Sequence, residues 1–147
     1  MSHGSTSSTS IRRQGRCLCG AIRFVAEGNP RWVAHCHCES CRRATSAPIA
    51  TYAGFAASDV VWSGEAPAEF HSSPGVVRRF CRRCGSPMSF ASDSWPGDIH
   101  LFVASFEDAA DFAPTLHVHV EEQLPWLHLA DGLPRFAKTA RDALPLP

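Results

Sequence analysis

Seven cysteines in three closely spaced groups are the residues of this sequence with the clearest potential for chemistry. The groups are the Cys-x-Cys pair of Cys17 and Cys19, the trio of Cys36, Cys38 and Cys41, and the Cys-x-x-Cys pair of Cys81 and Cys84. An odd count at such short spacings fits a disulfide framework poorly and is typical of metal ligands or redox thiols. A redox-active Cys-x-x-Cys usually lies in a βαβ setting, which the proline-broken surroundings of Cys81 do not provide. The spacing therefore predicts metal binding.

Both cysteine pairs have a geometry that suits a tetrahedral zinc ion. Residues i and i+2 of an extended strand face the same way, so Cys17 and Cys19 can present two sulfurs to one ion. The turn of a Cys-x-x-Cys pair does the same. Gly85 directly follows Cys84, and glycine is the residue that best tolerates the positive φ of such a turn.

The number of sulfurs predicts two sites of different character. Four sulfurs complete one tetrahedral site, whereas three leave a zinc ion with an open position for water or substrate. The natural grouping joins Cys17 and Cys19 to Cys81 and Cys84, and leaves Cys36, Cys38 and Cys41 as the three-sulfur site. Spacing alone leaves a second grouping open, in which Cys38 and Cys41 combine with Cys81 and Cys84.

Arginine is concentrated around the cysteines. All but one of the fourteen basic residues are arginine, and three Arg-Arg pairs lie close to the cysteine motifs: Arg42 and Arg43, Arg78 and Arg79, and Arg82 and Arg83. These guanidinium groups could balance the negative charge of thiolates, and Arg42 and Arg43 could also hold a substrate carboxylate. The alternative is that they are solvated surface charge. The sequence leaves both interpretations open.

Histidines and one acidic residue are weaker candidates. His35 and His37 flank the first cysteine of the trio, but on a strand they point away from it, which favours a position behind the sulfurs or on the surface. His117 and His119 share one parity of a predicted strand and could line the substrate cleft, with the apolar parity facing the core. A polar outer face is the favoured alternative. Glu39 is interpreted as a turn residue rather than a proton acceptor.

Composition limits the class of protein. The chain has 147 residues, of which 44% are hydrophobic and 19% charged, and its formal net charge is zero. These values exclude collagen-like, coiled-coil and wholly disordered chains, and they give no support for binding to nucleic acid or to an anionic membrane. No apolar run approaches the ~20 residues of a membrane span, and the N-terminus lacks the order of a secretory signal. We therefore expect a cytoplasmic protein.

Short strands must position the cysteines. Alternating segments between Gly, Pro, Asp and Ser residues predict strands over residues 17–25, 31–35, 49–55, 60–62, 69–71, 76–80, 88–91, 99–105 and 115–120. Eleven prolines and ten glycines argue against long helices. Residues 38–44 and 135–142 are the only plausible helices, and both are short. The sequence thus predicts a mainly β single domain over residues 12–147, preceded by a flexible Ser/Thr-rich tail over residues 1–11.

Three motifs contain all seven cysteines in order. They read Gly15-Arg-Cys-Leu-Cys-Gly-Ala-Ile-Arg-Phe24, His35-Cys-His-Cys-Glu-Ser-Cys-Arg-Arg43 with Ala47-Pro48, and Phe80-Cys-Arg-Arg-Cys-Gly85. With the closing segments Pro114-Thr-Leu-His-Val-His119, Pro125-Trp126 and Asp131-Gly-Leu-Pro134, they resemble the glutathione-dependent formaldehyde-activating enzyme family, which also includes centromere protein V. One departure is Ser46, where the family often has Gly, so we expect the loop beyond the trio to differ in shape.

The resemblance implies a β-tent fold with two zinc ions per chain. Matched motif to motif, Cys17, Cys19, Cys81 and Cys84 correspond to the ligands of a structural zinc. In the same way, Cys36, Cys38 and Cys41 correspond to the ligands of a catalytic zinc.

A zinc ion held by three thiolates is a weak generator of hydroxide, but it suits an incoming thiol, because coordination favours the thiolate form. The family resemblance implies a carbon–sulfur lyase that adds such a thiol, glutathione or a similar compound, to formaldehyde or another small aldehyde. The product from formaldehyde is S-hydroxymethylglutathione. The alternative is a non-catalytic, zinc-stabilised binding module, in which a residue such as His37 would fill the fourth position.

Overall fold

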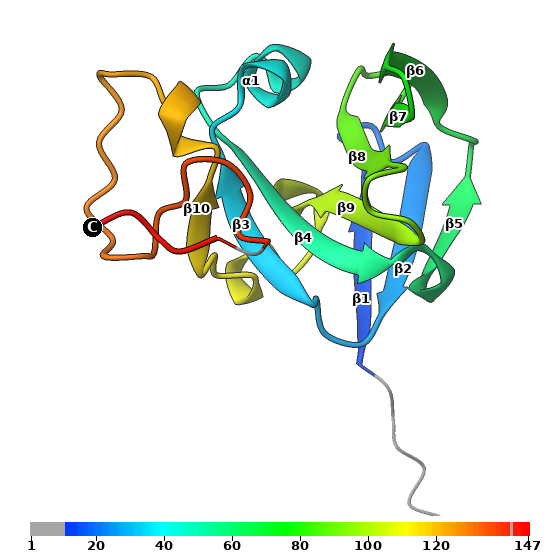
Figure 1. Ribbon diagram of the computed structural model, residues 1–147. Coiled ribbons are helices and arrows are strands. Elements are labelled where there is room, and N and C mark those ends of the chain that lie inside the picture. The colour runs from blue at the N-terminus through cyan, green and yellow to red at the C-terminus, as the bar shows by residue number, and fades with distance from the viewer. Residues whose placement is uncertain (1–10, 142) are drawn as a thin grey trace, which may run out of the picture.

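Two β-sheets form the framework of the protein (Figure 1). The computed structural model describes residues 11–141 and 143–147. Of the predicted tail, residues 1–10 lie outside the described residues, and Ile11 is exposed ahead of the first strand. The described chain is mainly β, and the predicted fold class is confirmed.

The smaller sheet has three antiparallel strands in the order β1-β2-β5. Their bounds are β1 Arg12–Arg16, β2 Ile22–Glu27 and β5 Val60–Gly64. The larger sheet has the order β10-β3-β4-β9-β8-β7-β6. Its strands are β3 Trp32–Cys36, β4 Ala50–Ala56, β6 Ala68–Ser73, β7 Val76–Phe80, β8 Pro87–Ser92, β9 Asp98–Phe102 and β10 Leu116–Val118. The α-helix α1, Glu39–Thr45, links β3 to β4.

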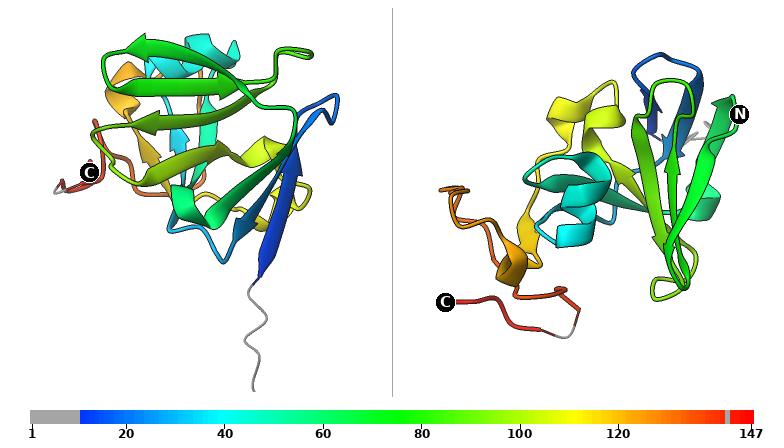
Figure 2. Two further views of the ribbon diagram at one scale, coloured as in Figure 1. Left: turned by 90° about the vertical axis from the view of Figure 1, so that its right-hand side faces the viewer. Right: turned by 90° about the horizontal axis from the view of Figure 1, so that it is seen from above.

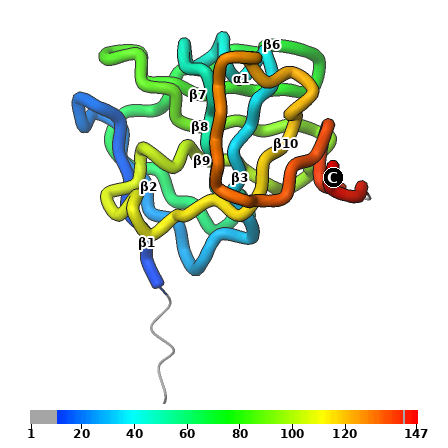
Figure 3. Tube along the Cα trace, turned by 90° about the vertical axis from the view of Figure 1, so that its left-hand side faces the viewer, coloured from blue at the N-terminus to red at the C-terminus, as the bar shows by residue number. Residues whose placement is uncertain are grey.

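Strand β10 is added to the edge of the large sheet in parallel with β3, so that His117 lies beside His35. The C-terminal segment continues along this flank, and the small sheet forms the opposite flank (Figure 2). Figure 3 views the molecule from the side of β10 and the C-terminal segment. His37 and His117, eighty positions apart in the sequence, are thereby brought together beside the cysteine trio.

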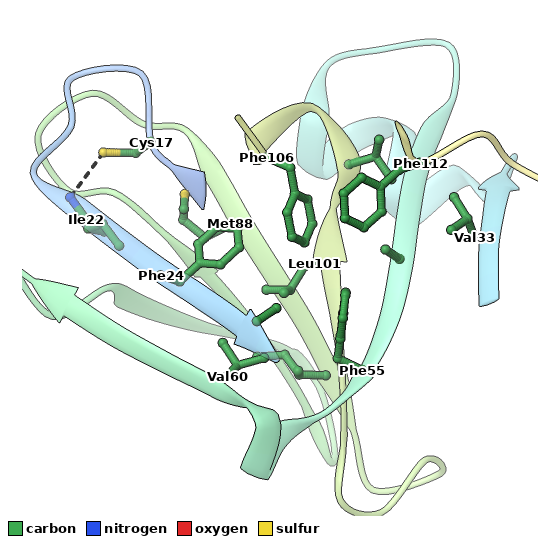
Figure 4. Close-up of a cluster of buried hydrophobic side chains, with 14 of the residues drawn as sticks. Cys17, Ile22, Phe24, Val33, Phe55, Val60, Met88, Leu101, Phe106 and Phe112 are labelled. Atoms are coloured by element: carbon green, nitrogen blue, oxygen red, sulfur yellow. Dashed lines mark hydrogen bonds between the residues drawn. The ribbon is translucent and has the colours of Figure 1, made fainter. Parts of the chain in front are cut away.

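The main hydrophobic core joins side chains of both sheets (Figure 4). On β2 the alternate residues Ile22 and Phe24 are buried, as the period of a strand with one covered face requires. Phe24 meets Phe106 edge to face, with ring centroids 5.1 Å apart, and Phe106 stacks on Phe112 at 4.1 Å. A second buried cluster consists of Cys36, Cys41, Ala50, Tyr52 and Phe102. The cysteine trio is therefore part of a packed core.

The predicted strands over residues 31–35, 49–55, 60–62, 69–71, 76–80 and 88–91 are confirmed as β3 to β8, and the helix predicted over residues 38–44 is confirmed as α1. Three strand predictions are too long. Residues 17–21 form a turn before β2. Beyond β9 and β10 the chain forms the short 3-10 helices Val103–Ser105 and Val120–Glu122.

The helix predicted over residues 135–142 is wrong for residues 135–141, the part that the structure describes. This segment forms long-range backbone hydrogen bonds instead. The N–H of His117 donates to the carbonyl of Pro134 at 2.9 Å, and the N–H of Phe136 donates to the carbonyl of His117 at 2.9 Å. Because these backbone groups are paired with β10 and the residues after it, they are not available for a helix.

In the described part of the chain, no helix combines the length and the apolar character that crossing a membrane would need.

Close packing of the Phe24 ring over its cross-strand partner makes Gly15 a sensitive position. A Cβ atom at Gly15 would lie 2.1 Å from Cζ of Phe24, whose ring is buried between Trp62 and Phe106. We expect Gly15→Ala to lower the free energy of unfolding by about 1–3 kcal/mol, because the core must shift to admit the methyl group. Denaturant titration measures this change. Gln14→Ala, on the exposed neighbour in the same strand, is the matched control, and equal stability of the two variants would contradict the prediction.

Candidate metal centres

Four sulfurs from two distant segments meet at one end of the small sheet. Cys17 and Cys19 lie in the turn between β1 and β2, and Cys81 and Cys84 follow β7. Their ligand atoms all lie within 4.8 Å of one another. The Sγ atoms of Cys17 and Cys19 are 3.6 Å apart, and those of Cys19 and Cys81 are 3.8 Å apart. Of the two groupings that spacing left open, the structure contains the one that joins these four residues.

Backbone turns aim these sulfurs. The Cys-x-Cys pair was expected on a strand, but Gly20 donates its N–H to the carbonyl of Cys17 at 3.1 Å and closes a turn there. The N–H of Ile22 donates to Sγ of Cys17 at 3.3 Å. After β7, the N–H of Gly85 donates to the carbonyl of Cys81 at 2.8 Å, and Gly85 has the positive φ of 77° that its position predicted. Hydrogen bonds from the side chain and backbone of Ser86 lower the pKa of Cys84 to about 5.

The second cluster is compact and more buried. Cys36 ends β3, Cys38 is the N-cap of α1, and Cys41 lies in the first turn of that helix. The N–H of Cys41 donates to Sγ of Cys38 at 3.2 Å, which is how a side chain normally caps a helix. The Sγ atoms of Cys36 and Cys41 are 3.7 Å apart. One strand end and one helix start thus direct three sulfurs to the same point.

The residue that ends α1 has a backbone conformation that glycine favours. Ser46 is the C-cap of α1, in the left-handed conformation with φ 51° and ψ 35°. Glycine adopts this region most readily. The serine at this position therefore does not by itself require a different backbone.

Residues from two other strands contact the three-sulfur cluster. Tyr52 on β4 donates its hydroxyl to Sγ of Cys41 at 3.4 Å. The guanidinium of Arg78 on β7 places Nη1 and Nη2 at 4.0 and 3.9 Å from the same sulfur. Tyr52 was not identified from the sequence. The sequence identified Arg78 only as one of six arginines near cysteine motifs. Its guanidinium contacts Cys41 of the trio, which is distant from it in sequence.

The contacts made by the protein alone shift the pKa values of Cys41 and Cys36 in opposite directions. Hydrogen bonding with Cys36 and Cys38, together with Tyr52 and the positive charge of Arg78, lowers the pKa of Cys41. Hydrogen bonding with Cys38 and Cys41, followed by burial, raises the pKa of Cys36. Neighbouring thiolates repel each other, so one sulfur ionises at the expense of the next. Three ionised sulfurs at this distance require a cation between them.

Both clusters fit zinc. With Zn–S bonds of about 2.3 Å, the sulfurs of a tetrahedral site lie roughly 3.8 Å apart. The sulfur separations of 3.6, 3.8 and 3.7 Å in the two clusters are close to this value. Among the residues that the structure describes, no imidazole or carboxylate joins the three sulfurs. The donor set is therefore four sulfurs in one cluster and three in the other.

His37 is directed away from the sulfurs and into a buried chain of hydrogen bonds. Its Nε2 lies 2.9 Å from Nδ1 of His117, and Nε2 of His117 lies 2.8 Å from Oδ2 of Asp131. The expected polar outer face at His117 is wrong, because this side chain is fully buried. In β10, His117 lies between His35 of β3 and Arg135 of the C-terminal segment, and Asp131 supplies its partner. The sequence signal that was missed is the acidic residue of Asp131-Gly-Leu-Pro134.

The other candidate residues have ordinary partners. Arg42 donates to the carbonyls of His37 and Glu122, at 3.3 and 3.2 Å. Arg43 donates to Glu39 at 3.0 Å, one helical turn away, and both are exposed. Glu39 is thus a surface residue of α1. His35 is half-buried, with Nδ1 2.8 Å from the hydroxyl of Thr51.

A cavity of about 450 Å³ borders the three-sulfur cluster. All three cysteines of the trio line it, as do Tyr52 and Arg78. The four-sulfur cluster does not line this cavity. The three-sulfur cluster thus has both the smaller donor set and a space for a small molecule beside it.

Comparison with known proteins agrees with this arrangement. The sequence profile of the glutathione-dependent formaldehyde-activating enzyme family matches residues 12–122. A Halomonas elongata protein named for the same family is 28% identical over 126 residues, which cover 79% of this chain and 80% of that protein. An uncharacterized lyase of Schizosaccharomyces pombe is 33% identical over 78 residues, which cover 53% of this chain and 56% of that protein.

A solved structure shows the same fold. The crystal structure of a Rhodobacter sphaeroides protein superposes with a TM-score of 0.53 and 24% sequence identity, over 65% of this chain and 88% of that chain. Residues 12–122, which the family profile matches, include all seven cysteines. From this match, the chain belongs to the glutathione-dependent formaldehyde-activating enzyme family.

Proposed function

We propose that this protein is a carbon–sulfur lyase that joins a thiol, glutathione or a similar compound, to a small aldehyde such as formaldehyde. Cys36, Cys38 and Cys41 would hold a catalytic zinc, and Cys17, Cys19, Cys81 and Cys84 a structural zinc. The family name supports the choice of glutathione and formaldehyde. The single observation that carries the proposal is the three-sulfur cluster beside a cavity.

The difference between three and four donors supports these two roles. A zinc ion with four protein ligands is closed and stabilises the fold, whereas three protein ligands leave one position open. Bound to the trio, zinc would supply positive charge and a position that favours the thiolate form of an incoming thiol. His37 is engaged with His117, which supports an exchangeable fourth position over the sealed site of a binding module.

Arg78 and Tyr52 would stabilise the negative charge of this site. Three thiolates around one zinc ion carry a net negative charge, and a substrate thiolate adds to it. The guanidinium of Arg78 lies within 4.0 Å of Sγ of Cys41, and it is held over the ring of Phe90 with Cζ 5.0 Å from the centroid. Tyr52 donates a hydrogen bond to the same sulfur. Both contacts stabilise negative charge in a partly desolvated place.

The reaction itself requires no oxidant. The sulfur of the thiol forms a bond to the carbonyl carbon, the π bond of the carbonyl breaks, and the proton lost by the thiol ends on the oxygen. The reverse reaction breaks the carbon–sulfur bond, as the term lyase describes. Thiols and aldehydes also react unaided, so the protein contributes mainly thiolate population and orientation.

The first prediction concerns metal content. Elemental analysis of the full chain is expected to find two zinc ions per chain. Cys38→Ser is expected to retain one zinc ion and the fold, because the four-sulfur cluster is untouched. Cys84→Ser is expected to lower the midpoint of thermal unfolding, because metal bound only by the folded state adds to its stability. One zinc ion in the unsubstituted protein, or equal destabilisation by both variants, would contradict the assignment.

The second prediction concerns Tyr52. Tyr52→Phe retains the ring that packs on Phe102, with centroids 4.5 Å apart, but removes the hydroxyl that donates to Cys41. We expect the zinc affinity of the trio to fall by about 10-fold, since partners of metal ligands have effects of this size. Chelator competition measures the affinity. The four-sulfur site serves as internal control. A zinc affinity of the trio equal to that of the unsubstituted protein, or an equal fall in affinity at both sites, would refute the role of Tyr52.

The third prediction tests the reaction. With glutathione and formaldehyde, the zinc-loaded protein is expected to accelerate exchange between free formaldehyde and S-hydroxymethylglutathione, measured by exchange NMR spectroscopy. Cys38→Ser should abolish this acceleration while one zinc ion remains. Ser40→Ala, an exposed position in the same helical turn, is the matched control and should retain it. Full activity of Cys38→Ser would rule out the trio as the catalytic site.

A further inference from the structure

The cavity beside the trio is much larger than formaldehyde. Its volume is about 450 Å³. Formaldehyde, with one carbon and one oxygen, is comparable in size to a water molecule, which occupies ~30 Å³ in the liquid. Cavities of roughly 300–1,000 Å³ in proteins bind organic molecules of drug size. The space therefore exceeds what the simplest aldehyde needs.

Aromatic rings form much of the cavity wall. His100 lies at their centre, with its ring centroid 4.6 Å from that of Trp32, 5.2 Å from Phe90 and 6.0 Å from Trp95. Tyr52 completes the group at 6.1 Å. All five side chains line the cavity. The arrangement offers both faces and edges of rings, which is the geometry that aromatic ligands prefer.

The aromatic wall carries no charge of its own at neutral pH. Burial lowers the pKa of His100 to about 4, so its imidazole is neutral there. Leu116, Val118 and Ala140 add aliphatic surface to the same cavity. Burial of an apolar ligand against such surface contributes about 25 cal/mol for each Å² removed from water.

Apart from the sulfurs of the trio, the charged side chains that line the cavity are both cationic. They are Arg78, beside the sulfurs, and Arg141, whose Cζ lies 3.5 Å from the centroid of Trp95. None of the described residues lining the cavity is acidic. Glutathione has an ammonium group as well as two carboxylates, and an unpaired ammonium group is costly to bury. The ammonium end of glutathione is therefore better placed in solvent, whereas its carboxylates suit Arg78 and Arg141. This leaves the apolar surface around Trp32 and Phe90 for the other reactant.

From these observations, and on the basis of the proposed function, we propose that the aldehyde substrate carries an aromatic ring, which packs against Trp32, Phe90 and Trp95 while its carbonyl carbon faces the three sulfurs. The reaction keeps the balance described above. The glutathione sulfur bonds to the carbonyl carbon of the aromatic aldehyde, the π bond breaks, and the proton of the thiol ends on the oxygen to give a thiohemiacetal.

The test compares three aldehydes with the zinc-loaded full chain and glutathione: 4-fluorobenzaldehyde, cyclohexanecarbaldehyde and formaldehyde. Exchange NMR spectroscopy gives the rate with protein divided by the rate without it, which corrects for the greater intrinsic reactivity of formaldehyde. We expect this enhancement to be at least 10-fold larger for 4-fluorobenzaldehyde than for either other aldehyde. Fluorine NMR also measures the binding of 4-fluorobenzaldehyde to the zinc-loaded protein without glutathione.

Trp95→Ala removes one aromatic wall. We expect it to weaken binding of 4-fluorobenzaldehyde, and to reduce the ratio of the aromatic to the formaldehyde enhancement, by about 2- to 10-fold. Trp126→Ala is the matched control, because Trp126 is 66% exposed and does not line the cavity. Circular dichroism and zinc content check that both variants are folded and loaded.

The outcomes separate this inference from the proposed function. Enhancement of formaldehyde but not of 4-fluorobenzaldehyde would overturn the aromatic substrate and leave the lyase function in place. Equal enhancement of cyclohexanecarbaldehyde and 4-fluorobenzaldehyde would also overturn it, because the rings would then confer no preference. Enhancement of no aldehyde at all would overturn both the lyase function and the inference.

Discussion

Repulsion between neighbouring thiolates is the constraint on which this structure depends. Sulfurs that lie 3.6 to 3.8 Å apart cannot all be ionised unless positive charge holds them together. The fold contains two such groups of sulfurs, at places with different surroundings. The four-sulfur cluster joins the β1–β2 turn to the end of β7 and so ties distant parts of the chain. The three-sulfur cluster lies deeper, in a buried group that includes Tyr52 and Phe102.

The large sheet determines which residues reach the three-sulfur cluster. β3 carries Cys36, its neighbour β4 carries Tyr52, and β7 contributes Arg78. On the other side of β3, the parallel strand β10 brings His117 next to His37. A hydroxyl and a guanidinium therefore face one sulfur, while a buried histidine pair holds the segment between Cys36 and Cys38. The site is built from both neighbours of β3 and from the more distant strand β7.

The sequence predicted the mainly β class, most strands and the helix α1, because short alternating segments between prolines and glycines contain strong local signals. The sulfur count also predicted a four-plus-three division that matches the two clusters. His117 was misplaced, because alternation identifies two faces of a strand but not which one a later segment covers. Residues 135–141 were misread as helical for the same reason: their partners lie on β10, and local propensity contains no information about them.

Residues of the C-terminal segment line the cavity beside the three-sulfur cluster. Thr139, Ala140 and Arg141 form part of the cavity wall, yet they lie beyond residues 12–122, where the family pattern ends. One part of the cavity wall thus comes from residues outside the stretch that contains the cysteines. Substitutions or insertions in the last stretch can reshape ligand preference without disturbing a single cysteine. Proteins that share the cysteine framework can therefore differ in this part of the cavity wall.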